Sequence, residues 1–299
     1  MNVRLLPYRA MFNLGRHSAV KYGRVRHSPA SLVLAACASL LLAGCAAPLV
    51  TGSGQGPDAG AGAGASISAQ PPHHTTIPAF SAAQAGEAVP SGWNEWILHP
   101  TKRRTQYTVV SDTGRRVVRA RADKSASGLI TPLNVDLDAT PVIEWQWLAE
   151  SLIADADNAI SATEDAPLRI VLAFEGDKST LPLRERLFAE RVKLLSGRDL
   201  PYASLMYIWG NQRPIESLIA NPHTSRVQKL VVDTGRSKLR QWRKHRRNIV
   251  ADYRRAFGTA PGRLIAVAIM TDTDNTASKS SAFYGDIRLV PAEPGETEK

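Results

Sequence analysis

Apolar and polar residues alternate along several stretches of the chain. Ile143, Trp145 and Trp147 are separated by single polar residues within 142–148, and residues 168–175 repeat the alternation with leucine, isoleucine and phenylalanine. A period of two residues places successive side chains on opposite faces of a β-strand. Both stretches are therefore expected to be strands with one buried face and one face in water.

Further short apolar runs, most of them bounded by Gly, Pro, Asn or Asp, are typical of strands between turns. They span residues 106–111, 116–122, 203–209, 227–233, 264–270 and 283–290. Two helices are expected over 183–195 and 242–257, because each ends before a glycine suited to the left-handed closing conformation. Eight strands with few helices between them predict a mainly β fold, an antiparallel β-sandwich of jelly-roll type, whereas an α/β fold needs a helix between most strand pairs.

The domain boundaries follow from a shift in composition. All six tryptophans lie beyond residue 90, and residues 45–90 consist mainly of Gly, Ala, Ser, Pro and Thr. Such a segment buries too little apolar surface to offset its ordering entropy. The sequence therefore predicts a flexible tether over 45–90, a sandwich domain over 91–291 and a polar tail over 292–299.

The first 44 residues have the organisation of an export signal. Six basic residues and no acidic one are accompanied by an apolar run at 31–44, which is too short for a permanent membrane-spanning helix. The run ends in Leu-Ala-Gly-Cys at Cys45, which resembles the lipobox of bacterial lipoproteins. The resemblance implies cleavage before Cys45, lipidation of that cysteine and, since Ala46 rather than Asp follows, an outer-membrane location facing the periplasm. An ordinary signal peptide is the alternative.

This expected cleavage changes the charge of the protein. The whole chain carries +10, but six of its 37 basic residues and none of its 27 acidic ones lie in the signal, which leaves +4 on the mature chain. A nucleic-acid partner is therefore not expected for this exported protein. Cys37 and Cys45 are the only cysteines, so the folded domain has no thiol for a disulfide, a nucleophile or a zinc site.

Acidic residues cluster in two expected loops. Asp272, Asp274 and Asn275 directly follow a strand and offer the hard oxygen ligands that calcium prefers, although capping of backbone amides in a polar turn explains the same residues. No motif requires any other cofactor. A second set lies between two expected strands and comprises Asp155, Asp157, Asn158, Glu164 and Asp165. If the two loops converge, a carboxylate pair can act as general acid and base in glycoside cleavage.

A glycan-binding set is a further candidate. Tyr207 and Trp209 alternate on one expected strand, and Asn211 lies just beyond it. A sugar ring stacks its apolar face on an aromatic ring while an amide bonds its hydroxyls, but alternating aromatic residues also build sandwich cores. The predicted ligand-binding set is completed by three loop residues, Asp155, Asp165 and His223.

The expected second helix is strongly basic. Residues 240–255 contain seven basic residues and one acidic residue. Such a run usually forms a solvated face, but near a membrane it can hold anionic lipid or phosphate. The candidate anion-binding residues are Arg243, Lys244, Arg246 and Arg247.

Several segments form a distinctive set, namely 200–211, Asn-Pro-His-Thr-Ser-Arg at 221–226, 247–258, 269–276 and 284–287. As a set they resemble the domain of unknown function 3047, a family of uncharacterised exported bacterial proteins, over about residues 93–290. Glu164 stands where the family pattern has the first of two aspartates before Pro-x-Arg. Since the family has no established activity, the resemblance implies the exported location and the domain boundary only.

Three functions remain open. The leading hypothesis is a lipid-anchored envelope protein that binds a glycan or another envelope ligand without catalysis, since the domain lacks nucleophile-elbow, zinc-protease and phosphate-loop motifs. One alternative is a carbohydrate-active hydrolase or lyase that uses the loop carboxylates. The other is an assembly factor that docks a protein partner through the basic helix.

Overall fold

The computed structural model describes residues 74–197 and 199–294. The expected signal peptide, the lipidation point Cys45 and the first part of the expected tether lie outside the described residues, as does the end of the tail. Among the described residues, no helix has the length and apolar character needed to cross a bilayer.

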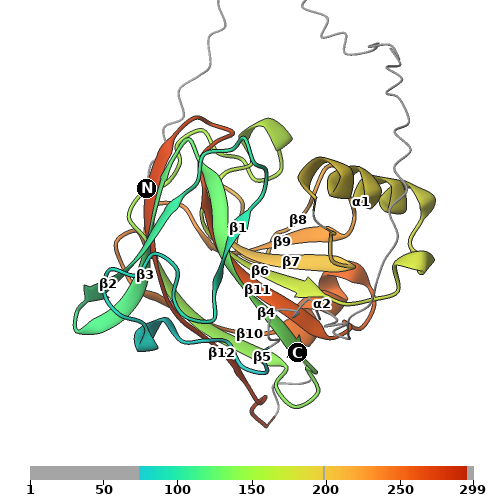
Figure 1. Cartoon of the computed structure of the whole chain (residues 1–299), viewed down its shortest axis with the longest axis horizontal. Coiled ribbons are helices and arrows are strands. Elements are labelled where there is room, and N and C mark those ends of the chain that lie inside the picture. Colours follow the sequence, from blue (N-terminus) through green and yellow to red (C-terminus); the bar gives the residue numbers. More distant parts are fainter. Residues whose placement is uncertain (1–73, 198, 295–299) are drawn as a thin grey trace, which may run out of the picture. The chain divides into compact units, whose positions relative to one another are not determined.

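Two sheets face each other (Figure 1). The first has seven strands, in the spatial order β1 (Asn94–Ile97), β4 (Ala126–Val135), β11 (Leu264–Asp272), β6 (Ala166–Phe174), β7 (Ala203–Gly210), β9 (Val227–Thr234) and β8 (Leu218–Ala220). The second has five, in the order β10 (Arg243–Asn248), β5 (Val142–Ala149), β12 (Lys279–Val290), β3 (Arg115–Asp123) and β2 (Gln106–Asp112). All neighbouring strands are antiparallel except β7 and β9. The predicted β-sandwich is confirmed.

The helices are α1 (Leu183–Ser196) and α2 (Ile249–Phe257), and short 3-10 turns lie at Phe80–Ala82, Ser161–Thr163 and Lys178–Thr180. Gly197 and Gly258 close the helices with φ values of 70° and 76°, a left-handed conformation that costs glycine little. The glycine stops expected from the sequence are therefore present at both helix ends.

The core lies between the two sheets. Trp145 and Trp147 point inward from β5, Tyr207 and Trp209 point inward from β7, and all four are buried. Trp145 stacks on Tyr207 with ring centroids 5.0 Å apart, which joins the middle of one sheet to the middle of the other. The period-two pattern thus gives the inward faces of both sheets. The water-facing side expected for 168–175 is wrong, because β6 is buried on both faces.

The helix predicted over 242–257 is wrong in its first half. Residues 243–248 form β10, an edge strand paired with β5, in which Arg243 lies opposite Trp147 and His245 opposite Trp145. The helix begins only after Asn248, whose side chain accepts a hydrogen bond from the Ala251 N–H at 3.0 Å. Strand pairing with β5 therefore overrides the helical preference of this basic run.

The domain begins earlier than the predicted residue 91. Phe80 is buried and packs on Trp93 with ring centroids 4.7 Å apart. Ser81 donates to Asp286 from its backbone N–H at 2.9 Å and from its hydroxyl at 2.6 Å. Residues 74–90 are thus part of the sandwich, because a few apolar side chains in a Gly-, Ala- and Pro-rich stretch are buried by tertiary contacts that composition does not reveal.

Candidate functional site

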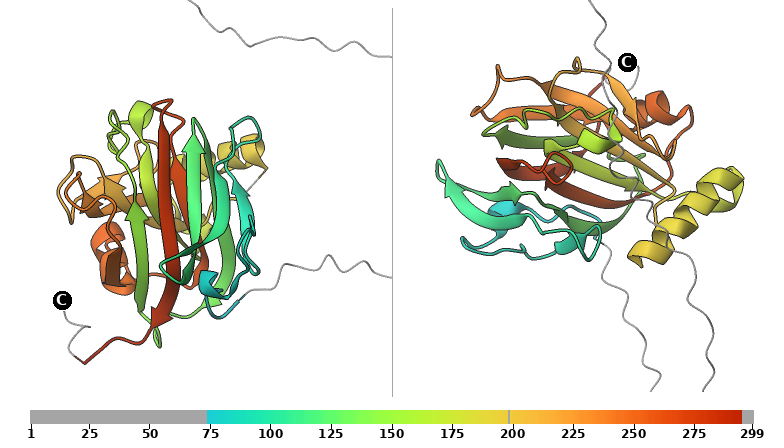
Figure 2. Two further views of the ribbon diagram at one scale, coloured as in Figure 1. Left: turned by 90° about the vertical axis from the view of Figure 1, so that its left-hand side faces the viewer. Right: turned by 90° about the horizontal axis from the view of Figure 1, so that it is seen from above.

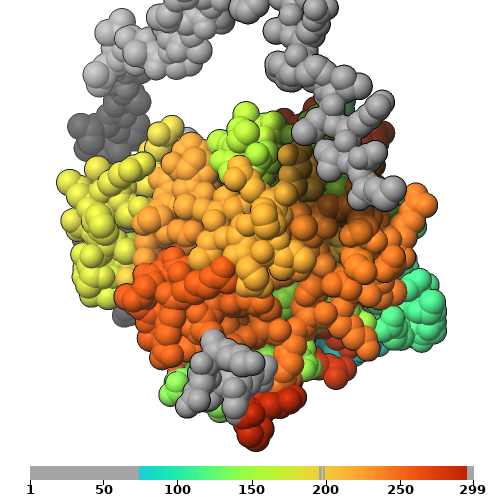
Figure 3. Space-filling model, turned by 180° about the vertical axis from the view of Figure 1, so that it is seen from behind, coloured from blue at the N-terminus to red at the C-terminus, as the bar shows by residue number. Residues whose placement is uncertain are grey.

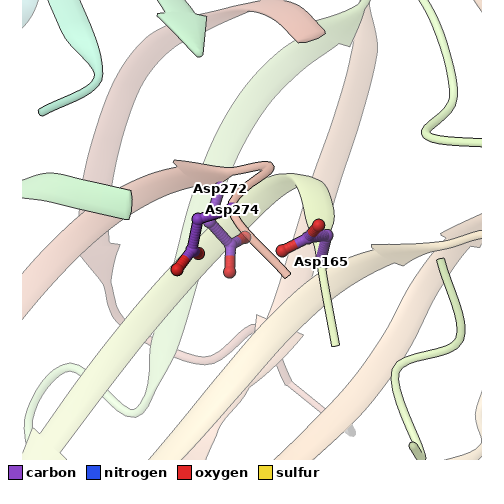
Figure 4. Close-up of side chains that lie close together, drawn as sticks. All are labelled: Asp165, Asp272 and Asp274. Atoms are coloured by element: carbon purple, nitrogen blue, oxygen red, sulfur yellow. The ribbon is translucent and has the colours of Figure 1, made fainter. Parts of the chain in front are cut away.

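The two acidic loops meet where β6 begins and β11 ends. Asp165 precedes β6, Asp272 ends β11 and Asp274 lies in the following turn (Figure 4). One carboxylate oxygen from each of the three lies within 4.8 Å of the others. The two acidic loops, whose meeting the sequence left open, therefore come together at these three residues.

Asp272 is held by a buried arginine on the neighbouring strand. Arg169 donates from Nε to Asp272 Oδ1 at 2.9 Å and from Nη2 to Oδ2 at 3.1 Å. The Ala166 N–H donates to the same Oδ1 at 3.1 Å. Both Arg169 and Asp272 are buried, so the pair is shielded from water and joins β6 to β11.

The other two carboxylates also have partners. Asp165 accepts from the Asn275 N–H at 3.2 Å, from the Thr276 N–H at 2.7 Å and from the Thr276 hydroxyl at 2.6 Å. Asp274 Oδ2 lies 2.5 Å from Lys102 Nζ, whereas its Oδ1 is buried without a hydrogen bond. Asp165 thus caps backbone amides of the turn after β11.

A second buried cation lies beside this cluster. Lys229 Nζ is 3.0 Å from Glu164 Oε1 and donates to the Asn158 carbonyl at 2.6 Å. Arg169 also donates to the Glu164 carbonyl at 2.6 Å. Lys229 and Arg169 therefore tie the loop before β6 onto the outer face of the seven-stranded sheet, and they offset part of the negative charge.

Burial changes the protonation of this network. It raises the pKa of Asp272 to about 6, with Arg169 opposing the rise and Asp165 adding to it. Burial also lowers the pKa of Lys229, and Glu164 opposes that change. Asp272 is thus able to take up a proton under mildly acidic conditions.

Calcium binding stays a sequence prediction. Three oxygens this close can share one calcium ion, and Asp274 Oδ1 has no competing hydrogen bond. However, Arg169 already neutralises Asp272, and Lys102 pairs with Asp274. An ion here would have to displace these cations.

The predicted aromatic ligands lie in the core instead of on the surface. Tyr207 and Trp209 are fully buried. Tyr207 donates its hydroxyl to Asp252 at 2.9 Å, and Trp209 donates Nε1 to the Gly235 carbonyl at 3.2 Å. Their ring faces are therefore not available for stacking on a sugar, and the core alternative holds.

Asn211 also has a structural task. Its side-chain amide donates to three backbone carbonyls at 3.0–3.1 Å, those of Ile153, Ala154 and Ala156. It thereby fixes the loop after β5.

The remaining loop candidates are exposed. Asp155 and His223 both face solvent. His223 Nε2 lies 3.3 Å from the Ser161 hydroxyl, and the side-chain amide of Asn275 donates to the Ser161 carbonyl at 2.6 Å. These contacts link the loop before β6 to two turns but form no set of converging catalytic groups.

The four predicted anion ligands divide between two faces because β10 is a strand. Arg243 points inward and donates to Asp233 at 3.1 Å. Arg247 also points inward and donates to Asp252 from Nη2 at 2.6 Å and to Glu216 from Nη1 at 2.6 Å. Both are engaged by acids.

Lys244 and Arg246 lie on the opposite face of β10. The register pairs them with Gln146 and Glu144 of β5, on the face turned away from the core. These two residues therefore belong to the outer face of the five-stranded sheet, seen with β12 in its middle in Figure 2.

This outer face has two grooves. The first, of about 400 Å³, is lined by four cations and two acids: Arg115, Lys244, Arg246, Arg288, Glu144 and Asp286. The second, of about 480 Å³, is lined by four cations and one acid: Arg103, Arg104, Arg121, Lys279 and Asp123. Both grooves thus carry an excess of positive charge.

An aromatic strip separates the grooves. Phe283 and Arg119 lie opposite each other on β12 and β3, between residues that line the first groove and residues that line the second. Trp242 lies 6.4 Å from Phe283 between ring centroids, and Arg115 sits over the Trp242 ring at 5.2 Å. This strip was not predicted from the sequence, although Arg115, Arg119 and Arg121 occupy positions on one face of β3 and are a signal for a basic sheet face.

Fold and surface together define a two-sheet β-sandwich with a basic, partly aromatic outer face. Residues 91–288 match the family model described as "Protein of unknown function (DUF3047)", so the chain belongs to that family. A comparison with curated proteins finds no match.

Solved structures give only weak similarities. Endoglucanase 3 of Trichoderma harzianum, from family GH12, has 10% identity and a TM-score of 0.36, with 72% of this chain and 95% of that chain covered. The family 12 xyloglucanase of Bacillus licheniformis has 7% identity and a TM-score of 0.39, with 73% and 98% covered. The CBM22-1 xylan-binding domain of Paenibacillus barcinonensis Xyn10C has 15% identity and a TM-score of 0.29, with 71% and 100% covered. At these scores the similarities carry no argument about this protein.

Proposed function

We propose that this protein binds an anionic glycan of the cell envelope along the outer face of its five-stranded sheet. The observation that carries the proposal is the pair of basic grooves on one face, with eight cations and three acids among their lining residues. A surface with this charge excess attracts polyanions. The planar guanidinium of arginine also forms paired hydrogen bonds with carboxylate and phosphate groups.

A glycan fits this face better than a small anion because the binding groups are spread along it. Trp242 and Phe283 lie between the grooves, with the guanidinium groups of Arg115 and Arg119 over their rings at 5.2 and 5.5 Å. A sugar ring packs its apolar face on aromatic rings of this kind once such an arginine turns to the ligand's anionic group. Gln106, Ser151 and Ser281 add polar groups at the second groove.

The hydrolase alternative depends on the acidic cluster. Asp272, whose pKa burial raises to about 6, has the protonation behaviour expected of a general acid. However, only 1% of Asp165 and 5% of Asp272 is exposed, so a polysaccharide reaches them only if the loop before β6 moves. Turnover of an envelope glycan that Asp274→Ala abolishes, with folding intact, would support this alternative.

The envelope location in the proposal comes from the predicted lipidation of Cys45. Mass spectrometry of the mature protein should find an acylated N-terminal cysteine. Replacement by Cys45→Ser should release the protein from the membrane fraction. An unmodified N-terminus would remove the lipid anchor from the proposal and leave glycan binding to be tested separately.

Glycan binding is tested by calorimetry on residues 46–299. Polygalacturonate, which carries a carboxylate on each sugar, should bind, and neutral dextran should not. Arg121→Glu and Lys244→Glu each place an acid in one groove and should weaken binding about tenfold. Lys178→Glu makes the same charge change at an exposed site near α1 and should have little effect.

The dependence of glycan affinity on salt concentration is a second, independent test of the proposal. Binding through exposed cations should weaken as ionic strength rises, because salt screens charges that face solvent. Unchanged affinity in both groove variants, or equal binding of dextran and polygalacturonate, would overturn the proposal.

A further inference from the structure

Helix α1 exposes three leucines on one stripe. Leu183, Leu187 and Leu194 are 62%, 60% and 86% exposed. At 3.6 residues per turn their side chains fall within about 40° of one another around the helix axis. A helix packed on a globular domain normally turns its apolar stripe toward the core, so α1 has the opposite arrangement.

The inner side of α1 is fixed by polar and aromatic contacts. Glu185 is buried and accepts hydrogen bonds from the Thr224 hydroxyl and from the N–H and hydroxyl of Ser225, the latter two at 3.0 Å. Phe188 stacks on His223 with ring centroids 6.3 Å apart. Because these contacts set the rotation of the helix, the leucine stripe faces outward.

Cations flank the stripe on both sides. Arg184 and Arg191 lie along one side, and Arg186 and Lys193 lie along the other, all of them exposed. Exposed Glu190 lies on the second side as well, and Lys193 pairs with Asp199 at 3.1 Å, so the cations outnumber the acid along the stripe. Apolar side chains bordered by arginine and lysine are typical of helices that lie in the interface of an anionic membrane.

The position of α1 leaves this stripe accessible to a flat surface. The helix stands at the periphery of the sandwich in Figure 1 and in the right view of Figure 2, and it forms the yellow edge of the space-filling view in Figure 3. The predicted lipidation point is also within reach, since 28 residues separate Cys45 from His74 and a chain of that length spans up to about 100 Å.

We propose that α1 docks on the surface of an anionic lipid bilayer, with the three leucines entering the boundary between headgroups and acyl chains. The flanking cations then meet lipid phosphates. A membrane is favoured over a protein partner because the four cations follow both borders of the stripe, and a bilayer supplies negative charge on both sides at once. This contact would orient the tethered domain relative to the membrane.

The test is co-sedimentation of residues 46–299 with vesicles. Vesicles of phosphatidylethanolamine and phosphatidylglycerol at a ratio of about 3:1 should bind the protein, and phosphatidylcholine vesicles should bind it much less. The double variant Leu187→Asp and Leu194→Asp should bind at least about tenfold more weakly, because it removes apolar area and adds negative charge. Circular dichroism checks that both proteins fold.

Two controls separate the stripe from other surfaces. Ile215→Asp changes another exposed apolar residue, 51% exposed, and should bind as the unsubstituted protein does. Arg121→Glu alters the basic sheet face and should keep most of the vesicle binding.

The proposal is overturned if the unsubstituted protein does not bind, or if the leucine variant binds equally well. It is also overturned if binding depends on Arg121 and not on the leucines. A leucine variant that changes the molar mass in light scattering without affecting vesicle binding would identify a second copy of the chain as the occupant, which again excludes the membrane.

Discussion

Arg169 and Asp272 form a buried ion pair through two hydrogen bonds, from Nε to Oδ1 at 2.9 Å and from Nη2 to Oδ2 at 3.1 Å. The pair joins β6 to β11 and supports the loop that carries Asp165. Its burial means that removing one partner leaves the other without compensation. The cluster is therefore important for stability, whatever its chemical role.

Arg169→Met should strongly destabilise the protein at neutral pH. The substitution leaves the Asp272 carboxylate buried and unpaired, and loss of one partner from a buried ion pair costs about 3–5 kcal/mol. Urea denaturation followed by tryptophan fluorescence measures the free energy of unfolding. Asp155→Asn, at an exposed carboxylate of the same loop, is the matched control and should change it by less than about 0.5 kcal/mol. If Arg169→Met also lowered the free energy of unfolding by less than about 0.5 kcal/mol, the ion pair would not be important for stability.

Asp272 should make stability depend on pH in an unusual direction. Burial raises its pKa in the folded protein from the ordinary 3.8 to about 6. The folded state then holds the proton more tightly than the unfolded state, so this contribution is complete below pH 3.8 and is lost as the pH rises through 6. The free energy of unfolding should fall by about 2–3 kcal/mol across this window from Asp272 alone.

Asp272→Asn isolates this contribution because the amide does not titrate. Comparison of urea denaturation at pH 4, 5, 6 and 7 should show a flatter dependence in the variant than in the unsubstituted protein. The loss caused by Arg169→Met should also be smaller at pH 4, where Asp272 is protonated. Identical pH profiles for the unsubstituted protein and Asp272→Asn would show that Asp272 keeps an ordinary pKa.

Asn248→Ala distinguishes the observed strand–helix junction from the continuous helix expected over 242–257. In the structure, Asn248 caps α2 by accepting from the Ala251 N–H, and loss of such a cap costs about 0.5–2 kcal/mol. In the interior of a continuous helix the same change would be slightly stabilising, since alanine has the higher helix propensity. The sign of the change in unfolding free energy therefore decides between the two arrangements.

The sequence predicts correctly those strands whose apolar residues are the ones buried in the folded protein. β5 alternates because one of its faces meets the core, whereas β6 and β7 are apolar and buried along nearly their whole length. β10 has no such signal, since its inward side chains Arg243 and Arg247 are charged. They are compensated by Asp233 and Glu216 from earlier segments and by Asp252 in the helix that follows the strand. Pairing partners of this kind depend on tertiary structure and leave no local pattern.

The candidate site also has a part that the sequence predicts and a part that it does not. The acidic residues of the two loops are visible as a local concentration of carboxylates, and their meeting follows from adjacent strand ends. The cations that neutralise them, Arg169 and Lys229, occupy strand positions where a charged residue would ordinarily face water. Their burial arises because the loop before β6 covers the outer face of the sheet, which the sequence does not indicate.

Calcium provides the last test of the acidic cluster. Arg169 and Lys102 already compensate Asp272 and Asp274, so we expect the melting temperature to be the same in calcium and in EDTA. The assay is sensitive enough, because an ion at about one hundred times its dissociation constant stabilises the folded state by about 2.7 kcal/mol. A rise in melting temperature that Asp274→Ala abolishes would contradict this expectation and establish the metal site, since Asp274 Oδ1 is the buried oxygen left without a hydrogen bond. A rise that persists in Asp274→Ala would place the ion elsewhere on the protein.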